Sequence, residues 1–236
     1  MTSLSSTNSN SEIEKWESIY ANGDQVNEYP FDYVVSTVKR LTANHEVEVG
    51  KFLELGCGTG ANLMFAAKEG WQTTGIEMSS SAIEICKELF ERQGIDGEWI
   101  CLNFSDLNLD FEKYSFALDR AAVTHVHPSL ALTTWDQVWH SLIPGGFMLT
   151  QVFEVSSDSN LAATDPNYSM SRGTGHLSSQ PPVCFYSEES LWKWLGDKWE
   201  LVFMDNVQTL RKNGDKESSR LAWIWCLVRK PITPIA

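Results

Sequence analysis

The chain has 236 residues and a formal net charge of −13, from 31 acidic against 18 basic side chains. This length is typical of one α/β domain that buries a single substantial core. The acidic excess argues against nucleic acids and anionic membranes as partners, because a sequence-independent grip on phosphates needs clustered Lys and Arg. A small-molecule substrate is the better expectation.

The cysteines have neither the spacing of a zinc site nor that of a disulfide framework; they are Cys57, Cys86, Cys101, Cys184 and Cys226. We therefore expect a reducing, cytoplasmic location and no bound metal. Residues 1–11 are rich in Ser, Thr and Asn, which predicts a disordered tail rather than a secretory signal. The longest apolar run, at 221–228, is far shorter than the roughly 20 residues that a membrane-spanning helix needs.

Apolar strands alternate with amphipathic helices in the first two thirds of the chain. The apolar runs predict five strands, at 51–55, 71–77, 97–103, 115–119 and 147–153. Three helices are predicted between them, at 59–69, 79–94 and 129–143. Serines open the second helix, and glycines close the first two. This alternation is typical of a parallel sheet with helices on both faces.

The pattern lapses at residues 155–183, where Ser, Asp, Gly and Pro are frequent. So long a connection inside a compact domain predicts a lid-like insertion or a disordered one. A helix is then predicted near 187–195, followed by two long strands, at 198–210 and 220–230, with a short polar link. Such a pair forms a hairpin, so the predicted seven-stranded, mostly parallel sheet ends on an antiparallel strand.

A glycine-rich turn joins the first strand to the first helix, in the sequence ELGCGTG at 54–60. Gly56, Gly58 and Gly60 let a ligand approach the main chain and meet the free N–H groups of the helix start. Glu77 closes the next strand, where a carboxylate can accept hydrogen bonds from both hydroxyls of a ribose. Together these features predict an adenosine site at the carboxyl edge of the sheet.

The spacing of the glycines bears on which adenosine cofactor binds. Dinucleotide sites use G-x-G-x-x-G, whose third glycine opens the helix for a pyrophosphate, whereas this chain has G-x-G-x-G. The carboxylate of Glu54, just before the turn, would attract the cationic amino-acid end of a ligand and would repel a pyrophosphate. An NAD-dependent oxidoreductase stays open as the alternative.

Three stretches together resemble the class I S-adenosylmethionine-dependent methyltransferases. They are ELGCGTG with Glu77, DRAAVTHV at 119–126 and LIPGGFML at 142–149. The likeness runs from about residue 52 to 153 and implies a Rossmann-like methyltransferase fold whose antiparallel last strand matches the predicted hairpin. Residues 20–36 are similar to the N-terminal cap of some small-molecule members. We therefore predict a helical cap at 12–45 and the methyltransferase domain at 46–236.

The resemblance implies S-adenosylmethionine as the cofactor and a set of residues that hold it. Glu54 and the three glycines match the motif around the methionine part, Glu77 matches the ribose acid, and Met78 would pack on the adenine.

The remaining implied contacts come from four other places. Relatives often bind the adenine amino group with an aspartate after the third strand; here Asn103 and Phe104 hold that position, and Asp106 competes for the role. Asp119 would lie where the methionine end meets the acceptor. The ring of Tyr29, in the cap, would face the sulfonium charge.

Two histidines follow the fourth strand, close to the expected acceptor. His125 could deprotonate or orient a hydroxyl, amine or thiol, and His127 is the second candidate for this role. The pair could instead ligate a metal, but no third ligand is visible.

The sequence therefore predicts an enzyme that moves a methyl group from S-adenosylmethionine to an O, N or S atom of a small molecule, mainly by positioning the reactants. A non-catalytic cofactor-binding module is the other alternative. The sequence predicts no oligomeric state.

Overall fold

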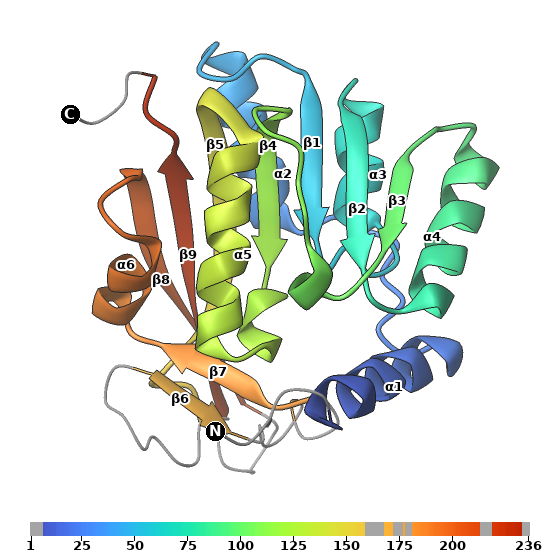
Figure 1. Ribbon diagram of the computed structural model, residues 1–236, viewed down its shortest axis with the longest axis vertical. Coiled ribbons are helices and arrows are strands. Elements are labelled where there is room, and N and C mark those ends of the chain that lie inside the picture. The colour runs from blue at the N-terminus through green and yellow to red at the C-terminus, as the bar shows by residue number, and fades with distance from the viewer. Residues whose placement is uncertain (1–6, 159–167, 172–176, 178–180, 213–218, 233–236) are drawn as a thin grey trace. The chain divides into compact units, whose positions relative to one another are not determined.

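The computed structural model describes residues 7–158, 168–171, 177, 181–212 and 219–232 of the chain (Figure 1). They form two compact units. The first holds residues up to Leu107 together with Tyr114–Ala117, and the second holds Asn108–Lys113 and the residues from Leu118 onward. Strand β4 (Tyr114–Arg120) contributes to both units.

The first unit contains the glycine-rich turn. Its elements, in chain order, are α1 (Thr7–Ala21), α2 (Asp32–Ala43), β1 (Lys51–Leu55), α3 (Ala61–Lys68), β2 (Gln72–Glu77), α4 (Ser80–Gln93), β3 (Glu98–Cys101) and the short 3-10 helix η1 (Phe104–Asp106). β2 lies between β1 and β3 and pairs with both in parallel. Four of the five residues of β1 are buried, as expected for a parallel strand covered on both faces.

Packing among buried aromatic side chains stabilises this unit. The rings of Phe52 and Phe116 stack with centroids 5.0 Å apart, and Trp71 packs edge-on against Phe52 at 5.7 Å. All three side chains are almost fully buried. Burial of such large apolar side chains is the main stabilising contribution to a unit of this kind.

The second unit holds the rest of the strands. Its elements are the 3-10 helix η2 (Val123–His125), α5 (Pro128–Ser141), β5 (Leu142–Glu154), β6 (Tyr168–Ser171), β7 (Val183–Tyr186), α6 (Glu188–Leu195), β8 (Glu200–Arg211) and β9 (Ser219–Arg229). β5 pairs in parallel with β7 and antiparallel with β9, and β8 forms a long hairpin with β9.

Most sequence-predicted elements are confirmed. Helix α4 begins after the N-cap Ser79, whose side chain accepts from the Ala82 N–H at 3.1 Å, and it ends at Gly94 in the left-handed region. The α/β pattern and the closing antiparallel hairpin are also as predicted.

Two predictions are wrong in part. Nine strands are described instead of seven, because β6 and β7 were missed. β6 falls inside the predicted insertion at 155–183 and pairs antiparallel with β7. Residues 159–167, 172–176 and 178–180 of that insertion lie outside the described residues. Helix α1 begins at Thr7, inside the segment predicted to be a disordered tail. No helix in the described part of the chain is both long and apolar enough to cross a membrane.

Candidate functional site

The glycine-rich turn has a backbone that only glycine adopts readily. Gly56, Gly58 and Gly60 have φ angles of 58°, 52° and 79°, all in the left-handed region. A side chain at such a φ is strained, so three closely spaced glycines are needed for the tight passage from β1 into α3.

Two of these glycines are also packed against the protein itself. A Cβ at Gly58 would lie 2.7 Å from the Tyr20 hydroxyl of α1, and one at Gly60 would overlap the Cys86 sulfur of α4. The sequence suggested that a ligand makes the close approach to this turn. At Gly58 and Gly60, however, the groups that approach the main chain closely are side chains of the same unit.

Glu77 closes β2 and is firmly fixed by main-chain donors. Its Oε1 accepts from the N–H groups of Met78 at 2.8 Å and Ser79 at 3.0 Å, and its Oε2 accepts from the Gly58 N–H at 3.1 Å. The side chain is only 6% exposed. Burial raises the pKa of this carboxyl, and the three N–H bonds oppose that rise.

These contacts test whether Glu77 suits a nucleoside. A carboxylate offers about four acceptor positions, and the described contacts use three. One position remains on Oε2 for a ribose hydroxyl, so the site fits a nucleoside sugar through a single hydrogen bond. The expected bond to both hydroxyls is harder to accommodate.

The residues predicted to surround the adenine have local roles. Asn103 caps η1, and its Oδ1 accepts from the Ser105 N–H at 3.1 Å. Its amide NH₂ group is not used in that cap. Phe104 is buried at 7% exposure, and Met78 is half-buried. Their contact with a cofactor stays a prediction.

The linker between α1 and α2 is clamped onto the start of α3. The Thr59 hydroxyl donates to the Asn27 carbonyl at 3.0 Å and accepts from the Asn27 N–H at 3.2 Å. The Asn62 side chain accepts from the Phe31 N–H at 3.0 Å and donates to Glu54 at 2.8 Å. Asn62 therefore joins the linker to the acid that precedes the glycine turn.

A cavity of about 280 Å³ opens beside this clamp. Its lining includes Tyr29, Thr59, Gly60 and Arg92. Tyr29 is 78% exposed. Its predicted contact with the cofactor therefore requires the ring to become covered on binding.

Helix α1 is fastened to the start of α4 through Glu17. The Glu17 carboxylate accepts from the hydroxyls of Ser79 at 2.7 Å, Ser80 at 3.2 Å and Ser81 at 2.5 Å, and also from the Ser81 N–H at 3.2 Å. The Ser81 hydroxyl is the largest of several contacts that lower the pKa of Glu17. A carboxylate at a helix N-terminus is also favoured by the helix dipole.

Asp119 lies at the end of β4, in the second unit, and is completely buried. Its Oδ1 accepts from the N–H groups of Ala122 at 3.1 Å and Val123 at 3.2 Å. Its Oδ2 accepts from the Trp135 indole at 3.0 Å and the Thr150 hydroxyl at 2.8 Å. Burial raises the pKa of Asp119 in spite of these donors. Four donors occupy the carboxylate, so its predicted contact with cofactor or acceptor has no support in these contacts.

The two histidines after β4 differ in their surroundings. His125 ends η2, is half-buried, and meets the Phe153 ring edge-on at 6.5 Å. His127 is exposed and caps α5, because its Nδ1 accepts from the Ser129 N–H at 3.3 Å. That cap gives His127 a structural role, and His125 is the better candidate for chemistry.

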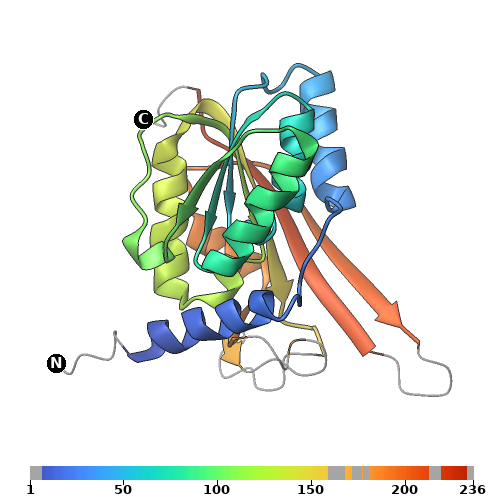
Figure 2. The same ribbon diagram turned by 90° about the vertical axis from the view of Figure 1, so that its right-hand side faces the viewer.

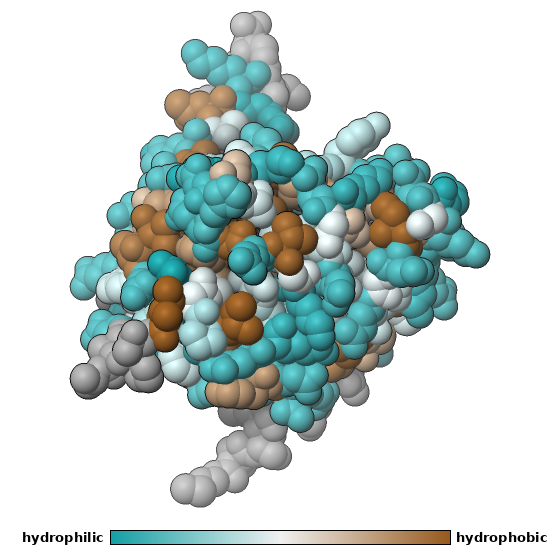
Figure 3. All heavy atoms as spheres, turned by 90° about the horizontal axis from the view of Figure 1, so that it is seen from above, coloured by the Kyte–Doolittle hydropathy of each residue, from teal (hydrophilic) through white to brown (hydrophobic). Residues whose placement is uncertain are grey.

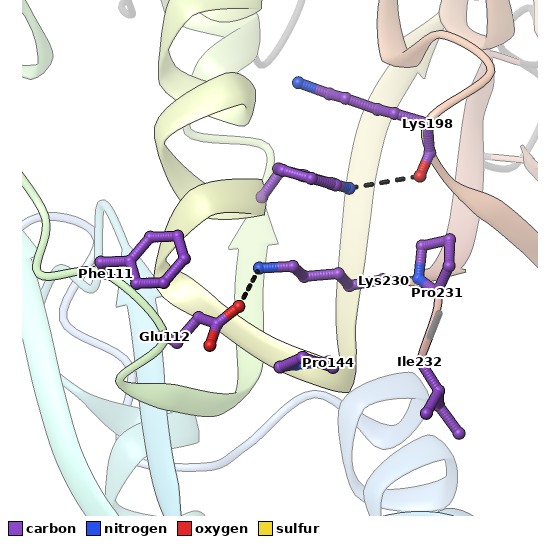
Figure 4. A pocket seen from close by; sticks show the side chains of 8 residues that line it. Phe111, Glu112, Pro144, Lys198, Lys230, Pro231 and Ile232 are labelled. Atoms are coloured by element: carbon purple, nitrogen blue, oxygen red, sulfur yellow. Dashed lines mark hydrogen bonds and ion pairs between the residues drawn. The ribbon is translucent and has the colours of Figure 1, made fainter. Parts of the chain in front are cut away.

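A second cavity, of about 310 Å³, lies within the second unit (Figure 4). Its Lys230 is 5% exposed, donates to the Leu142 carbonyl at 2.8 Å and to Glu112 at 3.3 Å, and lies 4.6 Å from the Trp139 ring centroid. The charges of Lys230 and Glu112 therefore pair with each other. Phe111 and Ile232 line the cavity and are exposed. The face of the molecule drawn in Figure 3 carries apolar side chains only in small groups among hydrophilic ones. Among the described residues, no cluster of His, Cys, Asp and Glu could hold a metal ion.

Comparison with known proteins shows which family part of the chain resembles. Residues 52–146 match the family model described as a methyltransferase domain. This match covers about two fifths of the chain and makes that segment similar to the methyltransferase-domain family. The matched residues include the glycine-rich turn, Glu77 and Asp119.

Two curated proteins match the chain over short stretches. The ribosomal RNA small subunit methyltransferase C of Alcanivorax borkumensis is 38% identical over 48 residues, which are 20% of this chain and 15% of that protein. A protein of Geobacillus sp. strain WCH70, whose name assigns it provisionally to the methyltransferases, is 32% identical over 83 residues. That match is 35% of this chain and 34% of the relative. The chain thus spans well under half the length of both relatives.

Solved structures agree over nearly the whole chain. One is 1,6-didemethyltoxoflavin-N1-methyltransferase of Burkholderia thailandensis with bound 1,6-didemethyltoxoflavin and S-adenosylhomocysteine. It has a TM-score of 0.71 at 17% identity, over 98% of this chain and 93% of that one. TehB from Haemophilus influenzae has a TM-score of 0.63 at 15% identity, over 91% and 67% of the two chains. At these identities the likeness shows the fold, which is α/β and Rossmann-like.

Sequence reasoning missed the contacts that fasten α1 and the linker. Ser79–Ser81 signalled a helix start, but nothing marked Glu17 as the acceptor of their hydroxyls. Asn62 gave no such signal, because its burial is known only from the structure.

Proposed function

We propose that this protein transfers a methyl group from S-adenosylmethionine to a small-molecule acceptor. The observation that carries the proposal is the buried, three-donor Glu77 at the end of β2, in a segment that matches a methyltransferase domain. A buried acid that keeps one acceptor position open suits one hydroxyl of a nucleoside sugar. The match to a methyltransferase-domain model favours this nucleoside over a dinucleotide.

Most of the proposed cofactor site lies in the first unit. Glu77 would accept a ribose hydroxyl, Met78 and Phe104 would contact the adenine, and Asn103 would offer its amide. The turn from Gly56 to Gly60, with Glu54 behind it, would hold the methionine part, whose ammonium group is attracted by a carboxylate. Helices α1 and α2, which include most of the predicted cap at 12–45, would cover the bound nucleoside.

The cofactor supplies an activated methyl group on a sulfonium. The protein's own contribution is to position the acceptor and to exclude water. A proton must also be removed where the acceptor is a hydroxyl, an amine or a thiol. We assign that role to His125, with His127 as the weaker candidate because it caps α5. Asp119 would act at a distance from the chemistry, by holding the segment that carries His125.

The acceptor is proposed to be a small molecule. A net charge of −13 disfavours a nucleic-acid backbone, and the Burkholderia protein of similar fold is named for a small heterocyclic substrate. The five cysteines are free, and one of them, Cys101, is exposed. Free thiols support the proposal of a reducing, cytoplasmic location.

Isothermal titration calorimetry tests the cofactor part of this proposal. The wild-type protein should bind S-adenosylhomocysteine and should not bind NAD. Binding of NAD alone would reject methyl transfer. Incubation with radiolabelled S-adenosylmethionine and pools of small acceptors then tests catalysis, and binding without transfer to any pool would favour a non-catalytic module.

A further inference from the structure

Strand β8 is a long edge strand. It has twelve residues and pairs with β9, and no other strand in the described part of the chain pairs with it. β9 pairs with β5 only through Trp223–Arg229, whereas β8 follows β9 as far as Ser219. The far end of the hairpin therefore extends beyond the ladder with β5, as Figure 2 shows.

Apart from one bulge between Leu201 and Phe203 and its charged side chains, this edge lacks the usual protection against pairing with another chain. Edge strands are commonly short, or carry Lys or Pro that discourage a new partner. β8 has neither residue and is about twice the usual strand length. Its exposed residues include Leu201, Val202 and Leu210, at 48%, 40% and 67% exposure.

The register with β9 fixes which side chains of β8 share a face. The pairing shifts between Leu201 and Phe203, so a bulge inserts one extra residue there. Residues opposite odd-numbered positions of β9 lie on one face, among them Glu200 and Arg211. Residues opposite even-numbered positions lie on the other face, among them Leu201, Asn206 and Leu210.

A second copy of β8 fits this edge in one antiparallel register. Two identical antiparallel strands are related by an axis perpendicular to the sheet, so residues that face each other must lie on the same face. With Asn206 on that axis and the bulge counted as one position, Glu200 faces the partner's Arg211 and Leu201 faces the partner's Leu210. Each pair occurs twice, and both obey the face assignment.

We propose that β8 is the contact surface for a second copy of this chain, in an antiparallel β8–β8 pair centred on Asn206. Opposite charges and apolar pairs across strands are stabilising, and like charges are not. Centring the pair on Asp205 would place two carboxylates face to face. Centring it on Val207 would leave Glu200 beyond the end of the partner strand. An unrelated peptide would have no reason to reproduce the Glu200–Arg211 match.

Cysteine cross-linking tests the register directly. In a Cys101→Ser background, which removes the exposed native thiol, Asn206→Cys places two cysteines on the axis. Facing residues of antiparallel strands have Cα atoms about 4.5–5.5 Å apart, within reach of a disulfide. Gln208→Cys is the matched control on the same face. It faces the partner's Met204, so its two copies are separated by four residues, or about 13 Å.

Mild oxidation of the full chain should therefore give a covalent dimer with Asn206→Cys and none with Gln208→Cys, on non-reducing gels. Equal cross-linking of both variants would overturn the proposed register. So would a wild-type chain that stays monomeric in sedimentation velocity up to about 100 µM, since typical specific self-association is tighter than that.

Charge reversal supplies an independent test. Glu200→Arg or Arg211→Glu alone should weaken the dimer about tenfold in Kd, because each change breaks two pairs at once. The double variant should recover most of the wild-type Kd. If neither single reversal changes the Kd of the dimer, the dimer uses another surface and the proposal fails.

Discussion

Replacing Glu77 by Gln separates two roles that the structure gives to one side chain. The Gln oxygen can keep the bonds from Met78 and Ser79, because both donate to Oε1. The Gln NH₂ group would then stand where Oε2 now accepts from the Gly58 N–H at 3.1 Å. Two donors would face each other in a buried place, and the open acceptor position for a ribose hydroxyl would be lost.

The size of the effect follows from that one broken contact. A buried N–H left without an acceptor costs about 1–3 kcal/mol of unfolding free energy. In a chain of this size each kcal/mol lowers Tm by about 2–4 °C. The lost bond to the ribose should also weaken binding of S-adenosylhomocysteine by about 1.5–3 kcal/mol, or roughly 10- to 150-fold in Kd.

Urea denaturation and calorimetry measure the two effects on the same preparation. Glu69→Gln is the control, because Glu69 is a partly exposed partner of Lys39 in a surface ion pair, which is worth about 0–1 kcal/mol. The reasoning is refuted if Glu77→Gln retains wild-type affinity for S-adenosylhomocysteine. Lost affinity with unchanged stability would instead show that the Gly58 contact contributes little.

Asp119→Asn leaves the buried Trp135 N–H facing an amide N–H, so we expect a loss of about 1–3 kcal/mol in urea denaturation at pH 7. Burial raises the pKa of Asp119 above its ordinary value of 3.8. The wild-type free energy of unfolding should therefore fall as pH rises from 3.8 through the raised pKa of the folded state. Urea titrations of Asp119→Asn over the same pH range should lack this fall. Glu17→Ala should speed hydrogen exchange throughout α1, whereas the exposed Glu14→Ala should not; equal rates in both would show that the serine contacts do not hold the helix. His125→Ala should lower methyl transfer severalfold and leave S-adenosylhomocysteine affinity unchanged in calorimetry; wild-type turnover would remove His125 from the mechanism.

Local signals predicted the elements that local chemistry determines. Helix α4 runs from Ser80 to Gln93, within one residue of the prediction at each end, because Ser79 and Gly94 cap it. The glycine turn and the acid at the end of β2 also depend on short-range spacing. The family match over 52–146 covers this same part of the chain.

Contacts between distant residues were beyond the sequence. β7 has four residues without alternation, and it is a strand because it pairs with β5 at Phe153 and Glu154. Glu17 reaches Ser79 across 62 positions of sequence, so no local pattern reports the contact. Asp119 was predicted as a ligand contact from its place at a strand end, but donors from α5, β5 and the main chain after β4 surround it.

The packing of Gly58 and Gly60 against Tyr20 and Cys86 changes how a mutational survey of this protein should be interpreted. Alanine at either position would push aside a neighbouring side chain before any nucleoside arrived. An activity screen alone would then assign both glycines to ligand recognition, although misfolding had caused the loss. Soluble yield and a melting curve need to accompany every activity value from this turn.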